Sequence, residues 1–279
     1  MDVFTDRRFG GNPLAVFPDA RSMSDEHMQK LAAEFNLSET TFVLPPADPA
    51  NTARVRIFTR KTEMPFAGHP NVGTGWVLRQ RGALLRFEEI AGLVEVKVAA
   101  GDVVTIDAPQ PLSLGAEMRV DMLAGCAGLE PGDVVTATHN PVAASVGNGF
   151  VIAEVTNDAL TRAAPDIAKF RSAHAVFKPL GDRLPVYLYA RVNETRLRAR
   201  MFGPLGGTLE DAATGSAATP LAALLLGRTG AEKARFDIVQ GVEMGRPSLL
   251  MTQAWRAKDG IRASVGGTCV PVLSGEVTL

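Results

Sequence analysis

The chain has 279 residues, 46% of them hydrophobic, and its 29 basic and 30 acidic side chains leave a net charge of −1. The basic residues are scattered singly or in short pairs, which excludes the concentrated positive surface typical of a nucleic-acid-binding protein. No apolar run reaches the roughly 18 residues that a membrane span needs. Because no basic segment followed by an apolar stretch opens the chain, we expect a cytoplasmic protein.

Short β-branched or alternating runs dominate the first half and predict strands. The expected strands are residues 2–4, 14–17, 40–44, 54–58, 94–99 and 103–107. A helix is predicted over residues 24–35, because Ser24 suits a helix cap and the acidic Asp25 and Glu26 suit a first turn. A second helix is predicted over residues 70–80, since Pro70 suits the first helical position.

The second half repeats this mixture. Strands are expected at residues 151–155, 186–190, 197–202, 236–239, 248–252 and 261–265, and helices at 119–127 and 217–226. Arg196, Arg198 and Arg200 alternate with apolar residues, which predicts a strand with one solvated face. Because strands outnumber helices and do not alternate strictly with them, the order indicates an α+β fold, not a doubly wound sheet.

Pro109 and Pro111, followed by Ser113 and Gly115, predict a domain boundary in the middle of the chain. We therefore expect one domain over residues 1–110 and another over 111–279, with the C-terminal strand returning to the first domain.

A faint internal repeat connects the two halves. Residues 56–58 precede the loop 67–70 and an apolar helix, and residues 200–202 precede the loop 213–216 and a second apolar helix. The two loops lie about half the chain length apart, which is too far for a solenoid repeat. The pattern predicts two similar domains facing each other, each offering a helix N-terminus to a shared cleft.

The loop of Asp211 to Ser216 is a candidate binding site. Small residues at a helix start let a ligand approach backbone N–H groups, which favour anions. Ser216 could cap the helix or donate to a ligand, and Asp211 could accept a proton or bind a hydroxyl. The alternative interpretation is a plain helix cap with a solvated Asp211.

The corresponding loop in the first half contains Gly68 and His69, where backbone donors are expected to be exposed. His69 could donate to a substrate oxygen or move a proton. The alternative is a histidine satisfied by a backbone carbonyl.

Glu39 lies between a predicted helix end and an apolar strand. Partial desolvation there would raise its pKa toward a range useful for acid–base catalysis, although an isolated glutamate is more often solvent-facing.

Neither a metal site nor a disulfide framework is expected. The four histidines, His27, His69, His139 and His174, are not paired at i+4 or set among carboxylates. Cys126 and Cys269 are far apart in sequence and do not form a zinc or disulfide pattern. No organic cofactor has a candidate motif either, because the glycines after Gly68 lack the lysine of a phosphate-binding loop.

Taken together, these segments resemble the PhzF-like family of phenazine biosynthesis, within the diaminopimelate epimerase superfamily. The resemblance spans nearly the whole chain, and the loops of Glu39, His69 and Asp211 are specific to it in combination. The matching segments are residues 2–6, 9–13, 36–43, 58–75, 201–204, 210–218 and 265–267. One departure is Ala212, where the family commonly has proline after the aspartate.

The resemblance implies two similar domains, each a curved antiparallel β-sheet wrapped around a central α-helix, with the site in the cleft between them. Racemases of the superfamily use two cysteines, but Ala67 and Ala213 occupy those positions here, and alanine cannot accept a proton. PhzF-like members use one glutamate, matched by Glu39, to move a proton within the substrate. The type substrate is trans-2,3-dihydro-3-hydroxyanthranilate.

Further residue roles are implied by the same resemblance. Residues matching His69, Asp211 and Ser216 orient the substrate, and backbone donors at Gly68 and Gly215 hold its carboxylate. No cofactor is implied, the partner is a small carboxylated molecule, and the family often forms homodimers.

Two other hypotheses remain open at this stage. A thiol-free epimerase would need a second acid/base, for which only His69 or Asp211 could serve. A non-catalytic protein would bind small acids in the same cleft without turnover.

Overall fold

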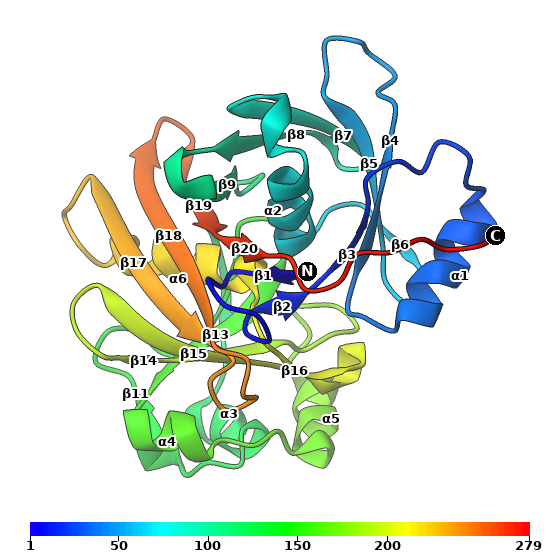
Figure 1. The fold of residues 1–279 in the computed structure, drawn as a ribbon. Coiled ribbons are helices and arrows are strands. Elements are labelled where there is room, and N and C mark those ends of the chain that lie inside the picture. Colours follow the sequence, from blue (N-terminus) through cyan, green and yellow to red (C-terminus); the bar gives the residue numbers. More distant parts are fainter. The chain divides into compact units, whose positions relative to one another are not determined.

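The computed structural model describes residues 1–279 and divides into two compact units. Unit 1 comprises Met1–Asp107 and Gly266–Leu279, and unit 2 comprises Ala108–Val265. Each unit combines a β-sheet with helices (Figure 1), which confirms the predicted α+β class. No helix is both long enough and apolar enough to cross a membrane.

Unit 1 contains a mixed sheet and a small three-stranded antiparallel sheet, β2–β1–β20. In the mixed sheet, β3 runs parallel to β4 and β5 runs parallel to β7, whereas the other pairs are antiparallel. The strands are β1 (Asp2–Val3), β2 (Asn12–Pro13), β3 (Ala15–Phe17), β4 (Thr40–Leu44), β5 (Ala53–Phe58), β6 (Glu63–Met64), β7 (Leu84–Glu89), β8 (Gly92–Val98), β9 (Val104–Asp107) and β20 (Cys269–Val270). The helices are α1 (Asp25–Phe35) and α2 (Gly68–Val77), with short 3-10 turns η1 (Arg79–Arg81) and η2 (Ala100–Asp102).

Unit 2 is also built on a mixed sheet, in which β13 runs parallel to β14 and β15 parallel to β17. The strands are β10 (Ser113–Glu117), β11 (Val134–Val135), β12 (Val142–Ser145), β13 (Gly149–Val155), β14 (Val186–Arg191), β15 (Arg196–Gly203), β16 (Thr208–Asp211), β17 (Lys233–Gln240) and β18 (Ser248–Ala257), with β19 (Gly260–Gly267) starting in this unit. The helices are α3 (Val120–Cys126), α4 (Asn157–Arg162), α5 (Ile167–Val176) and α6 (Gly215–Gly227), with 3-10 turns η3 (Pro131–Asp133) and η4 (Pro204–Gly206).

Both units contain the same strand–helix–strand connection. In unit 1, β5 is followed by its short antiparallel partner β6, then by α2, and then by β7, which is parallel to β5. In unit 2, β15, β16, α6 and β17 follow the same order with the same strand directions. The sequence repeat corresponds to this connection. Parallel neighbours need a crossover and cannot be joined by a tight hairpin, so the prediction of a purely antiparallel sheet is wrong at these pairs.

Helix α2 is almost entirely enclosed by unit 1. It carries no charged side chain, every residue from Gly68 to Gly75 is buried, and it contacts β1, β3, β4, β8 and β9 (Figure 1). A helix without a polar face must be buried on all sides. Gly75 allows the closest approach, because a Cβ atom at this position would lie 2.5 Å from Val96 Cγ1 and 2.9 Å from Val104 Cγ1.

Helix α6 has the same character in unit 2. It is rich in alanine and leucine, nearly all of its residues are buried, and it contacts β12, β13, β17 and β18. Both central helices begin two residues earlier than predicted, at Gly68 and Gly215. The first N–H groups of a helix need no intrahelical acceptor, so Pro70 fits inside the first turn of α2 as well as at its start.

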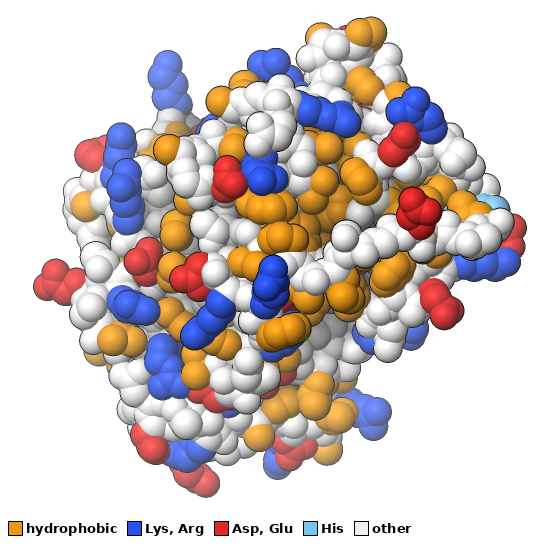
Figure 2. All heavy atoms as spheres, in the orientation of Figure 1, with side chains coloured by type: hydrophobic (Ala, Val, Ile, Leu, Met, Phe, Trp, Pro, Cys, Tyr) orange, Lys and Arg blue, Asp and Glu red, His pale blue; other side chains and the backbone are white.

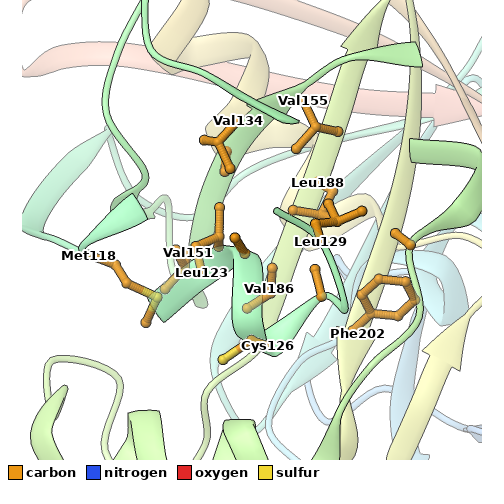
Figure 3. Close-up of a cluster of buried hydrophobic side chains, with 14 of the residues drawn as sticks. Met118, Leu123, Cys126, Leu129, Val134, Val151, Val155, Val186, Leu188 and Phe202 are labelled. Atoms are coloured by element: carbon orange, nitrogen blue, oxygen red, sulfur yellow. The ribbon is translucent and has the colours of Figure 1, made fainter. Parts of the chain in front are cut away.

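The second face of the unit 2 sheet is covered by α3, α4 and α5, of which α4 and α5 were not predicted. Figure 3 shows part of the core that these helices close, with Leu123 and Cys126 of α3 against Val151 and Val186 of the sheet. Successive residues of a strand point to opposite faces. A sheet that is apolar on both faces needs helices on both, so unit 2 contains two helices, α4 and α5, beyond those predicted.

Arg200 corrects the prediction of a solvated strand face. Its side chain is buried, and Nε and Nη2 donate to the Glu210 carboxylate at 2.8 and 2.9 Å. Nη1 donates to the backbone carbonyls of Leu160, Thr161 and Ala163. Helix α4 packs on β15 and removes this side of the strand from water. The alternation of arginine with apolar residues in the sequence could not reveal that α4 covers this side of β15.

We expect Gly75→Ala to destabilise the protein by about 1–3 kcal/mol, because the stiff β-branched Val96 and Val104 cannot move away from the added methyl group without strain. Urea denaturation would measure the change in the free energy of unfolding. Gly275→Ala is the control, since a Cβ atom there meets nothing within 4 Å. Equal stability of the two variants would contradict the close packing inferred for α2.

Candidate active site

Glu39 lies where the chain enters a buried strand. Helix α1 ends at Phe35 and is followed by its C-cap residue Asn36, whose backbone adopts the left-handed conformation with φ 54°, and β4 begins at Thr40. The Asn36 side chain accepts a hydrogen bond from Arg60 Nη1 at 3.4 Å, which holds this corner. This turn leads from the exposed end of α1 into β4, and Glu39 is the last residue before the strand.

The Glu39 carboxyl is largely withdrawn from water, with 18% of its side chain exposed. Burial raises its pKa above the ordinary glutamate range, and the Ser38 hydroxyl and the positive charge of Arg60 offset part of this rise. The interpretation of Glu39 as an ordinary solvent-facing residue is therefore wrong. A desolvated carboxylate is a stronger base than one in water, and its conjugate acid remains a usable proton donor.

His69 lies beside this carboxyl, in the first turn of α2. Its side chain is only 6% exposed, and its Nδ1 atom is 3.5 Å from Glu39 Oε2. A buried hydrogen bond of 2.9 Å from Thr74 Oγ1 to Thr41 Oγ1 ties α2 to β4, the two elements that carry the pair. The structure therefore brings together two residues that are thirty positions apart in the sequence.

The N-terminus of α2 has no side-chain cap. Its N-cap residue is Ala67, in an extended conformation, and no side chain bonds to the first turn. Gly68 follows it and is buried. Backbone N–H groups at a helix start favour an anion. This end of α2 thus combines a site suited to a carboxylate with a candidate acid/base beside it.

In unit 2, Asp211 ends β16 just before α6. Its carboxylate accepts a hydrogen bond of 2.7 Å from Thr214 Oγ1. Thr214 is the N-cap residue of α6 and makes no side-chain cap bond to the helix. Gly215 and Ser216 are the first two helical residues, so Ser216 is not the cap, contrary to one of the roles considered for it.

Gln240, at the end of β17, holds this loop and was not singled out in the sequence. Its Oε1 atom accepts from Tyr187 Oη at 3.0 Å and from the Thr214 backbone N–H at 3.2 Å. Its Nε2 atom donates to the Asp211 carbonyl at 2.8 Å and to Thr214 Oγ1 at 2.9 Å. The only signal in the sequence is an amide side chain that closes an apolar strand, which by itself does not identify a partner.

The structure offers no thiol at either loop. Ala67 and Ala213 occupy the two loop positions to which the resemblance assigns the cysteines of racemases. Cys126 lies in α3 and Cys269 in β20, and both are buried. Burial raises the pKa of each thiol to about 12, so neither is a ready proton acceptor at neutral pH.

No group of three or more His, Cys, Asp or Glu side chains is arranged to hold a metal ion. On the face drawn in Figure 2, Lys and Arg side chains are interspersed with Asp and Glu and form no continuous basic stripe. This distribution agrees with the scattered charges of the sequence.

The chain belongs to the family of phenazine biosynthesis-like proteins, PhzC-PhzF, whose family model matches residues 1–275. This confirms the predicted PhzF-like membership. The trans-2,3-dihydro-3-hydroxyanthranilate isomerase of Pseudomonas chlororaphis is 36% identical, over 100% of this chain and 98% of that protein. An uncharacterized isomerase of Mesorhizobium japonicum is also 36% identical, over 99% of this chain and 96% of its own length. The protein is thus a PhzF-family isomerase.

Solved structures agree with this assignment. A PhzF-family phenazine biosynthesis protein of Bacillus anthracis matches with a TM-score of 0.88 at 26% identity, covering 100% of this chain and 97% of that one. A probable proline racemase of Agrobacterium radiobacter matches with a TM-score of 0.58 at 11% identity, covering 93% and 83%. The racemase shares the fold alone.

We expect Gln240→Leu to cost about 1–3 kcal/mol of stability, because it leaves buried partners such as the Asp211 carbonyl without their donor. Tyr187→Phe is the matched control. It removes one of the four hydrogen bonds and leaves Gln240 Oε1 bonded to the Thr214 N–H, so we expect a smaller loss of about 0.5–1.5 kcal/mol. Thermal denaturation of both variants would measure the difference in stability. A Gln240→Leu variant as stable as wild type would contradict the role of Gln240 in holding this loop.

Proposed function

We propose that this protein is a cofactor-independent isomerase in which Glu39 moves a proton within a small carboxylated substrate. The observation that carries the proposal is the desolvated Glu39 carboxyl, 3.5 Å from His69 at the uncapped N-terminus of α2. A candidate base, a polar partner and a helix N-terminus suited to an anion thus occur together in unit 1.

The proposed reaction is a proton shift. The Glu39 carboxylate takes a proton from one substrate carbon, the electron pair of the broken C–H bond moves into the conjugated system, and the protonated Glu39 returns the proton to another carbon. Substrate and product have the same atoms, and Glu39 ends in its starting form. A carboxyl whose pKa is raised by burial suits both steps, because its two protonation states are closer in free energy at neutral pH.

The remaining loop residues are proposed to bind the substrate. Backbone N–H groups at Gly68 and Gly215 suit a carboxylate, since both glycines begin a helix. His69 is proposed to orient a polar group beside the reacting carbon. Asp211 and Ser216 are proposed to bind the amino or hydroxyl group, and the hydrogen bond from Thr214 presents Asp211 as a carboxylate acceptor.

The relatives supply the substrate class for this proposal. Three of them, from species of Pseudomonas, are named trans-2,3-dihydro-3-hydroxyanthranilate isomerase and are 35–36% identical. We propose trans-2,3-dihydro-3-hydroxyanthranilate or a similar cyclic amino acid as the substrate. Such a molecule has the carboxylate, the amino group and the acidic C–H bond that the site residues are suited to engage.

Glu39→Gln should lower turnover by about 100-fold to 10,000-fold, because an amide cannot carry the proton. The assay follows trans-2,3-dihydro-3-hydroxyanthranilate by NMR in heavy water. Glu34→Gln, in the exposed part of α1, is the control and should keep wild-type activity. Unchanged turnover in Glu39→Gln would exclude the assigned role.

The position of the deuterium in the product separates the proposal from its alternative. Incorporation at a different carbon from the one that lost the proton indicates the intramolecular shift. Incorporation with inversion at the same carbon indicates an epimerase. Binding of the substrate with neither exchange nor product would leave only the small-acid-binding hypothesis.

The value of kcat/KM should rise with pH on the acid side and level off above the pKa of Glu39. This carboxyl must be ionised to accept the first proton, and burial raises its pKa, so the half-maximal point should lie above the ordinary glutamate value of 4.5. A pH–rate profile from pH 4 to 7.5 would measure it. A midpoint at or below 4.5 would contradict the desolvated environment.

A further inference from the structure

An ion pair withdrawn from water in unit 2, between Arg200 of β15 and Glu210 of β16, has no assigned role in the proposed reaction. Arg200 Nε and Nη2 donate to Glu210 Oε1 and Oε2 at 2.8 and 2.9 Å, so the guanidinium and the carboxylate meet in the bidentate geometry. The two side chains are 7% and 16% exposed. Burying such a pair carries a desolvation cost that its attraction often only offsets, so its presence calls for an explanation other than stability.

Arg200 also bonds to the end of helix α4. Its Nη1 atom donates to the backbone carbonyls of Ala163, Leu160 and Thr161 at 2.6, 3.1 and 3.3 Å. The last carbonyls of a helix have no donor within the helix, and these bonds satisfy them. Because the guanidinium is planar and its donors have fixed directions, its bonds to α4 also set the direction in which it meets Glu210.

The backbone ladder that holds β16 is short. β16 pairs with β15 over three residue pairs, and the register shifts between Phe202 and Gly203. Gly207 lies just before β16 with φ 88°, a conformation that favours glycine. A short two-stranded ladder with an irregular register is marginal by itself. The Arg200–Glu210 pair adds a side-chain contact at the end of this strand.

The residue that follows Glu210 is Asp211, and their side chains lie on opposite faces of the sheet, since successive residues of a strand alternate. Glu210 is paired with Phe202 and Asp211 with Met201. Phe202 belongs to the core beneath α3, α4 and α5, so Glu210 faces these helices and Asp211 faces away from them. On that other side, Thr214 Oγ1 donates to the Asp211 carboxylate at 2.7 Å. Fixing Glu210 therefore also fixes the direction of Asp211.

We propose that the Arg200–Glu210 pair positions Asp211 for substrate binding, by fixing the end of β16 against the C-terminus of α4. The inference rests on the proposed function, in which Asp211 binds the amino or hydroxyl group of the substrate. Arg200 and Glu210 do not contact substrate. They are positioning residues that act through Asp211.

The other two arginines on this face of β15 have different surroundings. Arg198 donates through Nη2 to Glu243 and through Nη1 to Thr161 Oγ1 at 3.3 Å. Arg196 is exposed. Of the three, Arg200 alone is paired with the residue next to Asp211, and Arg196 provides a matched control position.

Arg200→Lys is the first test variant, because an ammonium keeps the positive charge beside Glu210 but cannot reproduce the planar fork of the guanidinium. KM should rise by about 10-fold to 100-fold with kcat nearly unchanged, because a hydrogen bond from the substrate to a charged group is weakened. Arg196→Lys, the same exchange at an exposed position, should keep both constants. A wild-type KM in Arg200→Lys would overturn the positioning role.

A double-mutant cycle tests whether Arg200 acts through Asp211. Asp211→Asn should raise KM by itself. Adding Arg200→Lys to Asp211→Asn should raise KM little further, because the carboxylate that Arg200 positions is already lost, whereas two independent effects would multiply. Full multiplication of the two effects would overturn the proposed route through Asp211.

Two further variants separate positioning from folding. Arg200→Met leaves the Glu210 carboxylate unpaired and should lower stability, whereas Arg200→Met combined with Glu210→Leu removes both charges and should regain part of the loss. Urea denaturation measures both. KM should stay raised in the combined variant although its stability recovers. Recovery of KM together with stability would indicate a merely structural role and overturn the inference.

Backbone amide hydrogen exchange needs no substrate and separates this inference from the proposed function. Exchange over residues 208–211 should be faster in Arg200→Lys than in the wild type or Arg196→Lys, because β16 would open locally more often. Unchanged exchange at β16 would overturn the inference whatever the activity. Faster exchange in a protein that does not convert trans-2,3-dihydro-3-hydroxyanthranilate would support the fixing of β16 by the pair and refute only the proposed function.

Discussion

The constraint on which this structure depends is the burial of its two central helices. Helix α2 and helix α6 carry no charged side chain, and nearly all of their residues are covered. A crossover that returns to the same sheet provides this cover and makes β5–β7 and β15–β17 parallel. Burying a whole helix also buries its N-terminus, where backbone N–H groups have no acceptor within the helix.

Polar groups near these buried helix ends are consequently held by a few well-placed partners. Thr74 bonds Thr41 at α2, and Gln240 bonds four groups around the start of α6. The same loss of water that stabilises the apolar helices disfavours the charged form of any carboxyl beside them. The pKa of Glu39 is raised for this reason, so the packing that builds unit 1 also alters the acidity of the proposed acid/base.

The family and the racemase share a fold but need not share chemistry. Alanine at positions 67 and 213 leaves both loops without a thiol, and the thiols of Cys126 and Cys269 are buried elsewhere. What the fold retains is two glycine-led helix starts suited to a carboxylate.

The sequence by itself determined the α+β class, most strands, both central helices and the family, because periodicity and short motifs are local properties. It also directed attention to Glu39, His69 and Asp211 as candidates. Only the tertiary structure placed Glu39 3.5 Å from His69, buried Arg200 under α4, and bonded Gln240 to the loop of Asp211. The reason is physical: desolvation and hydrogen-bond partners depend on what packs against a residue, and those neighbours come from distant parts of the chain.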